Sequence, residues 1–243
     1  MSAFNCFLTS DAAHVFTDAA IYESENLKVA AFASKVSLLP QYNAVIGFTG
    51  PYHNLPLLST FIAGLQYDNF DHLAAEFVSV IKRAVAKTND IFPNGAAMWG
   101  EYTFGLAGWS PKQSAPAFFS VKNDGANGQE VAVPATKYYN PDAAVEGFDD
   151  SITRFKFDPE RPGESGLEIM RAQRLKKFAP LGNVGVKYST YYAIGGFAQH
   201  TVVSRDGISV KILERWPDRI GSTVMPVMPV MTGSMMGGTF GGR

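Results

Sequence analysis

The side chains most often used for metal binding and nucleophilic catalysis, histidine and cysteine, are few in this chain. The sequence has one cysteine, Cys6, and four histidines, His14, His53, His72 and His200. No two histidines stand at the HxxH or HExxH spacing that places two metal ligands on one helix face. Cys6 lies within a short apolar run, which is typical of a small buried residue rather than of a reactive thiol. We therefore expect no metal site and no bound cofactor, and the sequence contains no glycine pattern of a nucleotide-binding loop.

Short apolar runs separated by polar turns fill the first part of the chain. Each run has the length of a strand, and Ser, Asp, Asn, Pro or Gly residues lie between the runs. No run is long enough to form a helix with an apolar stripe. The pattern predicts consecutive strands that pair as hairpins, at residues 4–8, 14–22, 27–32, 36–39 and 44–48.

Helical patterns follow Gly50. Residues 51–65 are apolar enough for a helix, although Pro56 would delay its start or kink it. Residues 70–87 repeat apolar side chains at the i, i+3, i+4 and i+7 positions of one buried helix face. A third helix is predicted at residues 164–178. Further strands are predicted at residues 102–109, 116–121, 197–204 and 208–216, and a short helix fits residues 142–148.

The composition is that of a soluble globular protein. The 243 residues carry a formal net charge of −1, and 46% of them are hydrophobic, which allows a large core. This balance offers no basic field for nucleic acid, and no segment reaches the roughly 18 apolar residues that cross a bilayer. The N-terminus lacks the pattern of a signal peptide. We therefore expect a cytoplasmic protein without nucleic-acid or membrane partners.

Motifs along most of the chain resemble the proteasome β-subunit and HslV-type peptidases, which are N-terminal nucleophile (Ntn) hydrolases. These motifs are Thr17-Asp18, Lys35-Val36, Gly47-Phe48-Thr49-Gly50, Gly108-Trp109 and Gly195-Gly196. The resemblance implies an α+β fold, a four-layer αββα sandwich of two antiparallel sheets between helices. Residues 1–221 would form this domain, with the first two helices outside one sheet and the third helix outside the other.

The resemblance also implies a candidate catalytic site at the start of the chain. Counting back from Asp18 by the spacing of the family leads to Ser2, which would be the nucleophile once Met1 is removed. Lys35 would be the cation that lowers the local pKa, with Asp18 as its partner. Backbone N–H groups between Gly47 and Gly50 would supply donors to the oxyanion.

The sequence departs from the pattern of active family members in three places. Tyr191 and Ile194 stand where those members have an Asp and a Ser, and the Gly-Ser-rich turn expected between residues 134 and 163 is missing. Ile has no hydrogen-bonding group, and Tyr is a poor substitute for a carboxylate. The alternative interpretation of Asp18 and Lys35 is a buried ion pair kept for packing, because breaking such a pair costs ~3–5 kcal/mol.

Residues 222–243 differ from the rest of the chain in composition. Their repeated Met-Pro-Val and their glycines prevent a helix or a central strand. Each large apolar side chain left in water would forgo about 1.5–3 kcal/mol of burial free energy. We therefore expect the strip from Val224 to Phe240 to lie against another chain of a homo-oligomer, with Met225, Met228, Met231 and Phe240 as assembly contacts.

Two functions follow from the resemblance. The first is a non-catalytic Ntn-fold subunit that acts through self-assembly or as a structural component of a larger particle. Because the sequence also resembles Ntn-fold proteins of phage gene clusters, that particle could be a phage virion or tail. The second is a peptidase or amidase of the proteasome and HslV class, with Ser2 as nucleophile. The departures at Tyr191 and Ile194 favour the first, and retention of Met1 would exclude the second, since Ser2 would then lack a free amine.

Overall fold

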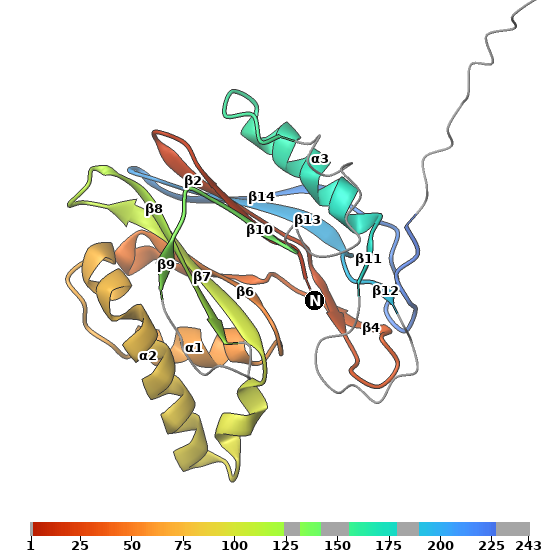
Figure 1. Ribbon diagram of the computed structural model, residues 1–243, viewed down its shortest axis with the longest axis horizontal. Helices are drawn as coiled ribbons and strands as arrows, with labels where there is room; N and C mark the ends of the chain where they lie inside the picture. Colours follow the sequence, from red (N-terminus) through yellow and green to blue (C-terminus); the bar gives the residue numbers. More distant parts are fainter. Residues whose placement is uncertain (1, 124–131, 142–155, 179–189, 227–243) are drawn as a thin grey trace, which may run out of the picture.

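The computed structural model describes residues 2–123, 132–141, 156–178 and 190–226. Within these residues the fold is α+β, with two five-stranded sheets, two small two-stranded sheets and three α-helices (Figure 1). Every strand pair among them is antiparallel. None of the helices in this part of the chain is both long and apolar enough to span a bilayer.

The two large sheets draw their strands from different parts of the chain. The first sheet has the order β10 (Lys137–Asn140), β1 (Phe4–Leu8), β2 (Ala12–Thr17), β13 (Phe197–Ser204) and β14 (Gly207–Arg215). The second has the order β5 (Val36–Leu39), β6 (Ala44–Thr49), β7 (Tyr102–Ser110), β8 (Ala115–Asn123) and β9 (Val133–Pro134). The small sheets pair β3 (Ala20–Tyr22) with β4 (Val29–Phe32), and β11 (Lys177–Phe178) with β12 (Tyr191–Tyr192).

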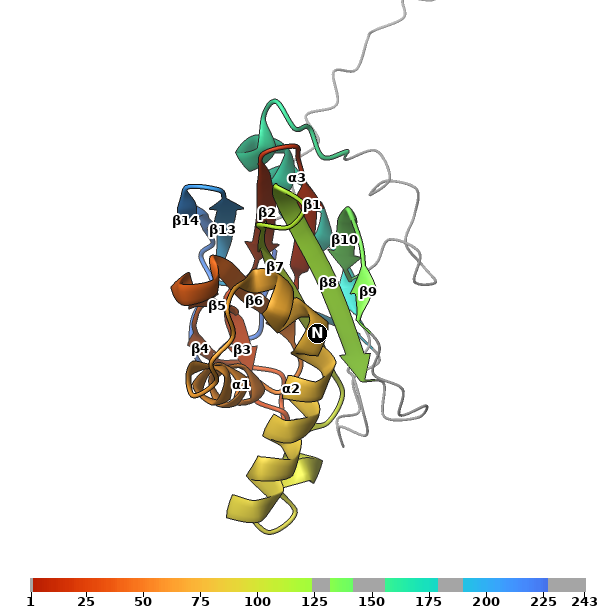
Figure 2. The same cartoon turned by 90° about the vertical axis from the view of Figure 1, so that its left-hand side faces the viewer.

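Two of the helices cover the second sheet. They are α1 (Asn54–Ala63) and α2 (Phe70–Ile91). Helix α1 begins three residues later than expected, so that Pro56 falls in its first turn. Proline lacks a backbone N–H, but the N–H groups of the first turn have no acceptor within the helix, so no hydrogen bond is lost there. Asn69 caps α2 by accepting a hydrogen bond from the His72 N–H. In both views the C-terminal half of α2 and the 3₁₀ turn η2 (Gly95–Trp99) extend beyond the end of the sheet (Figures 1 and 2).

Most of the core of the described residues lies in three large clusters of buried side chains. The largest lies between α1, α2 and one face of the second sheet. A second lies between α3 (Pro162–Arg174) and the outer face of the first sheet. The third joins the inner faces of the two large sheets, with Phe4, Val15, Val45 and Phe118 among its members. Because both faces of β1 are covered, nearly all of its residues are buried, as in a continuous apolar run.

Alternate side chains of β1 contact different layers. Phe4 and Cys6 point toward the second sheet, whereas Phe7 packs in the cluster beneath α3. The Asn5 amide donates to Gln173 Oε1 of α3 at 2.8 Å, and Gln173 Nε2 donates back to Asn5 Oδ1 at 2.9 Å. These reciprocal bonds satisfy two buried amides and fix α3 against the start of the chain.

Two of the corrections that the structure makes to predicted boundaries have a clear physical cause. The predicted strand at residues 14–22 is two strands, because the Asp18 carboxylate accepts the backbone N–H groups of Ala3 and Ala20 at the break. The predicted helix at residues 164–178 ends at Arg174, where Leu175 and Lys176 make tighter i→i−3 bonds. Phe178, which the prediction placed at the end of this helix, is buried in a strand paired with β12. The short helix predicted at residues 142–148 lies outside the described residues.

Candidate functional site

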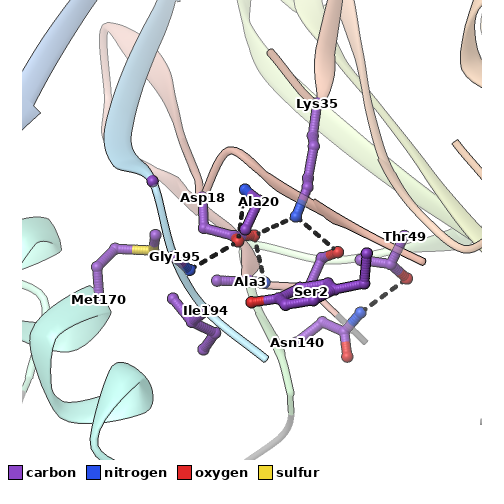
Figure 3. Close-up of polar contacts among 12 residues, drawn as sticks. Ser2, Ala3, Asp18, Ala20, Lys35, Thr49, Asn140, Met170, Ile194 and Gly195 are labelled. Carbon is purple, nitrogen blue, oxygen red and sulfur yellow. Dashed lines mark hydrogen bonds and ion pairs between the residues drawn. The ribbon is translucent and has the colours of Figure 1, made fainter. Parts of the chain in front are cut away.

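Ser2, Asp18 and Lys35 meet where the first strand begins. Lys35 Nζ donates to Ser2 Oγ at 2.8 Å and to Asp18 Oδ1 at 2.7 Å (Figure 3). All three residues are buried, Ser2 being 8% exposed, Lys35 3% and Asp18 0%. The ion pair expected between Asp18 and Lys35 is therefore present. Lys35 Nζ therefore joins the Ser2 hydroxyl to the Asp18 carboxylate, and an oriented polar cluster surrounds Ser2.

The topology of the strands brings these three residues together. Ser2 lies two residues before β1, and Asp18 directly follows β2, the hairpin partner of β1. The backbone N–H of Ala3 donates to Asp18 Oδ1 at 3.0 Å. This hydrogen bond to a side chain lies directly beyond the last backbone pair of the hairpin between β1 and β2. Lys35 directly precedes β5 of the second sheet, so its side chain crosses from that sheet to the first. The site thus lies at one end of the space between the two large sheets.

The Asp18 carboxylate accepts hydrogen bonds from four donors. Lys35 Nζ and the Ala3 N–H donate to Oδ1. The N–H groups of Ala20 and Gly195 donate to Oδ2 at 3.3 and 3.1 Å. A buried carboxylate needs such partners, because an ion without them would carry its full desolvation cost. Because hydrogen bonds hold both oxygens of Asp18, this carboxylate fixes the position of Lys35 relative to Ser2.

The environment of Lys35 favours loss of its proton. Burial lowers the pKa of the Lys35 amine, and the charge and hydrogen bond of Asp18 oppose this effect only in part. A lysine of lowered pKa at hydrogen-bond distance from a serine hydroxyl has the geometry of a general base next to a nucleophile. The arrangement can therefore activate Ser2 for attack on a carbonyl carbon.

Tyr191 and Ile194, the two departures from the family pattern, lie close to this cluster. Burial, followed by the negative charge of Asp18, raises the pKa of Tyr191 to about 12, so its phenol stays protonated at neutral pH. Ile194 is completely buried in the cluster beneath α3, and only its backbone carbonyl makes a polar contact. Neither side chain provides the negative charge that a carboxylate would bring beside the nucleophile.

The two glycines proposed as oxyanion donors have clear structural roles. Gly47 lies inside β6, opposite Val36 of β5 and Gly105 of β7. A Cβ atom at Gly47 would stand 2.2 Å from the Phe4 ring, so this position needs a bare backbone. Gly50 has a φ of +136°, a conformation that side chains disfavour. Packing and backbone conformation account for both glycines, and whether either N–H meets a substrate stays a prediction.

Several polar residues near the site were not identified from the sequence. Asn140 lies opposite Phe4 in the first sheet, and its amide donates to Thr49 Oγ1 of the second sheet at 3.0 Å (Figure 3). Arg174 of α3 forms a buried ion pair with Asp218. These pairs join residues 44 or more positions apart, and no local pattern in the sequence marks them.

A cavity of about 220 Å³ opens beside the short strand β12. Its walls are mostly apolar, with Lys177 and Asn26 at its polar part. Tyr191 lines the cavity and also lies close enough to Asp18 for that charge to raise its pKa. Tyr191 is therefore a lining residue that lies within the electrostatic field of Asp18, whereas Ser2, Asp18 and Lys35 do not line the cavity. The full lining is Asn26, Leu27, Lys177, Thr190, Tyr191, Tyr192, Thr223, Val224 and Met225.

Two of the four histidines contact each other, and the cysteine lies in the core. Two of the histidines, His14 and His200, come together on neighbouring strands of the first sheet, although no sequence motif joins them. No group of three or more His, Cys, Asp or Glu side chains that could hold a metal is found among the described residues. Cys6 is buried between the two large sheets, as expected, and burial raises the pKa of its thiol.

The start of the C-terminal strip packs on its own domain. Val224 is 3% exposed and forms a small cluster with Ala20 and Val29. Our expectation that the strip would contact only another chain is therefore wrong at its first residue. Met225 is 71% exposed and is available for an assembly contact. Met228, Met231 and Phe240 lie outside the described residues.

No protein-family model matches this sequence, and a search of curated proteins finds no match either. The function must therefore be inferred from the geometry of the site itself. That geometry offers one nucleophile, Ser2, one amine of lowered pKa, Lys35, and one carboxylate, Asp18, within a single chain of hydrogen bonds.

Proposed function

We propose that this chain is an N-terminal nucleophile hydrolase that cleaves amide bonds with Ser2. We further propose that its two large sheets and three helices form the four-layer αββα sandwich of that fold. The positions of the three core clusters support this fold, since helices pack outside each sheet and apolar side chains join the sheets. The location of the polar cluster at the start of β1 supports the same assignment.

A single observation carries the proposal. Lys35 Nζ lies 2.8 Å from Ser2 Oγ and 2.7 Å from Asp18 Oδ1, in a buried environment. An ion pair kept for packing alone requires the contact between Lys35 and Asp18 but not the contact with the serine hydroxyl. A lysine that also points a donor at a buried hydroxyl is placed to exchange a proton with it.

The reaction would proceed through an acyl-enzyme. Ser2 Oγ forms a bond with the carbonyl carbon of the substrate while its proton moves to the neutral Lys35 amine. The C–N bond then breaks, and Lys35 passes that proton to the departing amine nitrogen. Water hydrolyses the ester and restores the Ser2 hydroxyl. Asp18 holds Lys35 in place throughout and stabilises its ammonium form.

A non-catalytic subunit is the second candidate function. Ile194 favours it, because a completely buried apolar side chain stands where active members of the resembling family hold a serine. In this role the polar cluster would serve only to join β1, β2 and β5. The chain would act by assembling with copies of itself or within a larger particle, in the cytoplasm or in a phage virion.

Intact mass and covalent labelling distinguish the two functions. We expect the purified protein to lack Met1 and to react with diisopropyl fluorophosphate, which forms a phosphoester with an activated serine and releases fluoride. The added mass should map to Ser2 and should be absent from Ser2→Ala. Lys35→Met should react much more slowly. A protein that stays unlabelled at Ser2 would support the non-catalytic subunit instead. Labelling at Ser2 in a chain that keeps Met1 would leave Lys35 as the base but would contradict the N-terminal nucleophile assignment.

A further inference from the structure

A second buried ion pair lies next to the Ser2 cluster. Arg174 Nη2 donates to Asp218 Oδ1 at 2.7 Å, and Arg174 Nη1 donates to Asp218 Oδ2 at 2.8 Å. The side chains are 7% and 3% exposed. The Trp216 ring covers the guanidinium, whose carbon lies 4.7 Å from the ring centroid. This two-bond geometry is specific to arginine, because lysine lacks the planar fork.

The ion pair holds the turn at Ile194, Gly195 and Gly196 from both ends. Arg174 Nη1 donates to the Ile194 carbonyl at 2.6 Å. Asp218 Oδ2 accepts the Gly196 N–H at 2.7 Å. Between these two contacts lies the Gly195 N–H, which donates to Asp18 Oδ2 at 3.1 Å. The direction of that N–H is thus set by groups on α3 and on the segment that follows β14.

Electrostatics also connect the two carboxylates. Burial raises the pKa of the Tyr22 phenol most strongly, and the charges of Asp18 and Asp218 raise it further, whereas Arg174 lowers it. One side chain therefore lies within the field of both ion pairs. The charged group that faces Lys35 is Asp18, and Tyr191 is the further titratable group whose pKa responds to Asp18.

We propose that Arg174 and Asp218 are positioning residues that keep the Gly195 N–H on Asp18 and so set the negative charge that Lys35 experiences. This inference rests on the proposed function of Ser2 and Lys35. In this chain, Tyr191 and Ile194 supply no anionic group to the site, and the fixed turn acts on the site through its hydrogen bond to Asp18. Loosening the turn removes one hydrogen bond from Asp18, leaves its charge less compensated and favours the ammonium form of Lys35.

The pKa of Lys35, measured by NMR on lysine-labelled protein, tests this role without a substrate. The Lys35 signal is assigned by its loss in Lys35→Met. We expect Arg174→Lys, which keeps the positive charge but loses the two-bond geometry, to raise the pKa of Lys35 by about one unit, the scale on which a single hydrogen bond shifts a neighbouring group. Arg171→Lys is the matched control, since Arg171 pairs with Glu214 and also joins α3 to β14, but does not contact the turn. Its Lys35 pKa should equal that of the wild type.

A milder variant keeps the test decisive if the buried pair proves essential for folding. Trp216→Leu removes only the ring over the guanidinium and should raise the Lys35 pKa in the same direction by a smaller amount. Folded variants whose Lys35 pKa equals that of the control would overturn the positioning role. Labelling of Ser2 by diisopropyl fluorophosphate is measured separately. An unlabelled wild type refutes the proposed hydrolase, whereas an unshifted Lys35 in a labelled protein refutes only the role of Arg174 and Asp218.

Discussion

The Nδ1 atom of His14 lies 3.1 Å from the Nε2 atom of His200, on neighbouring strands of the first sheet. At this distance one nitrogen donates a hydrogen bond and the other accepts it. The two rings therefore cannot both be positively charged, because a charged imidazole carries a proton on each nitrogen. The His200 ring also stacks on Phe16, with centroids 4.3 Å apart. Burial lowers the pKa of both histidines. His14 and Lys211 lower that of His200 further, to about 3, while Asp11 opposes the shift at His14.

This pair predicts a loss of stability in acid. Each histidine has a lower pKa in the folded chain than its ordinary value of 6.5, so the unfolded chain binds more protons below that pH. The contribution of these two histidines to the free energy of unfolding is fully present above pH 6.5. It decreases as the pH falls toward 3, by at most about 1.4 kcal/mol per pH unit for each histidine. Urea unfolding at pH 7.5, 5.5 and 4.5 measures this slope. His200→Phe should reduce it, whereas His72→Gln, which removes an exposed histidine, should not.

Lys35 should contribute far more to stability than a surface lysine. Lys35→Met would leave the Asp18 carboxylate buried without its cation, and we expect a loss of about 3–5 kcal/mol in the free energy of unfolding. Lys87→Met is the control, because Lys87 and Asp90 form an exposed pair worth no more than about 1 kcal/mol. Thermal and urea unfolding of the two variants give the comparison. Equal losses would show that the ion pair of Asp18 and Lys35 is not the buried contact described above.

Most strands and helices were predictable from local patterns. The run at residues 4–8 and the periodic apolar face that begins at Phe70 match β1 and α2, although α2 continues one turn further to Ile91. The ion pair of Asp18 and Lys35, which is present, was expected from the family resemblance and not from a local pattern. The predicted strand at residues 14–22 was wrong at Asp18, where the carboxylate side chain, instead of a backbone carbonyl, accepts backbone N–H groups. There the run of apolar residues continues, but the hydrogen-bonded ladder does not.

The contacts that complete the site depend on tertiary structure alone. The bond between Gly195 and Asp18 joins residues 177 positions apart, and the pairing of Arg174 with Asp218 spans 44 positions. Arg174 lies on the buried face of an amphipathic helix, where periodicity suggests only that its stem packs. Its guanidinium is buried because Asp218 and the Ile194 carbonyl satisfy it, and those partners come from two separate segments, one before β13 and one after β14.

Gly47 should tolerate no side chain as long as Phe4 keeps its ring. The ideal Cβ of Gly47→Ala would meet a Phe4 ring carbon at 2.2 Å. We expect an overpacking cost of about 1–3 kcal/mol in the free energy of unfolding. Adding Phe4→Leu should recover part of this loss, which a double-mutant cycle measures. Gly64→Ala is the control, since its Cβ would make only an ordinary contact at 3.5 Å and its backbone is helical. Additive effects of Gly47→Ala and Phe4→Leu would contradict the packing role.

The junction between the domain and its C-terminal strip should lie after Pro226 rather than after Gly221. The Val29 N–H donates to the Ser222 carbonyl at 2.9 Å, and Val224 is buried against Ala20 and Val29. A chain that ends at Gly221 loses both contacts, and we expect it to be less stable by about 1.5–3 kcal/mol, the value of burying one valine. A chain that ends at Pro226 should unfold like the full protein. Light scattering on the longer truncation then tests assembly separately, and loss of self-association there would assign the connecting role to residues 227–243. If both truncations unfold at the same urea concentration, Ser222 and Val224 do not belong to the domain.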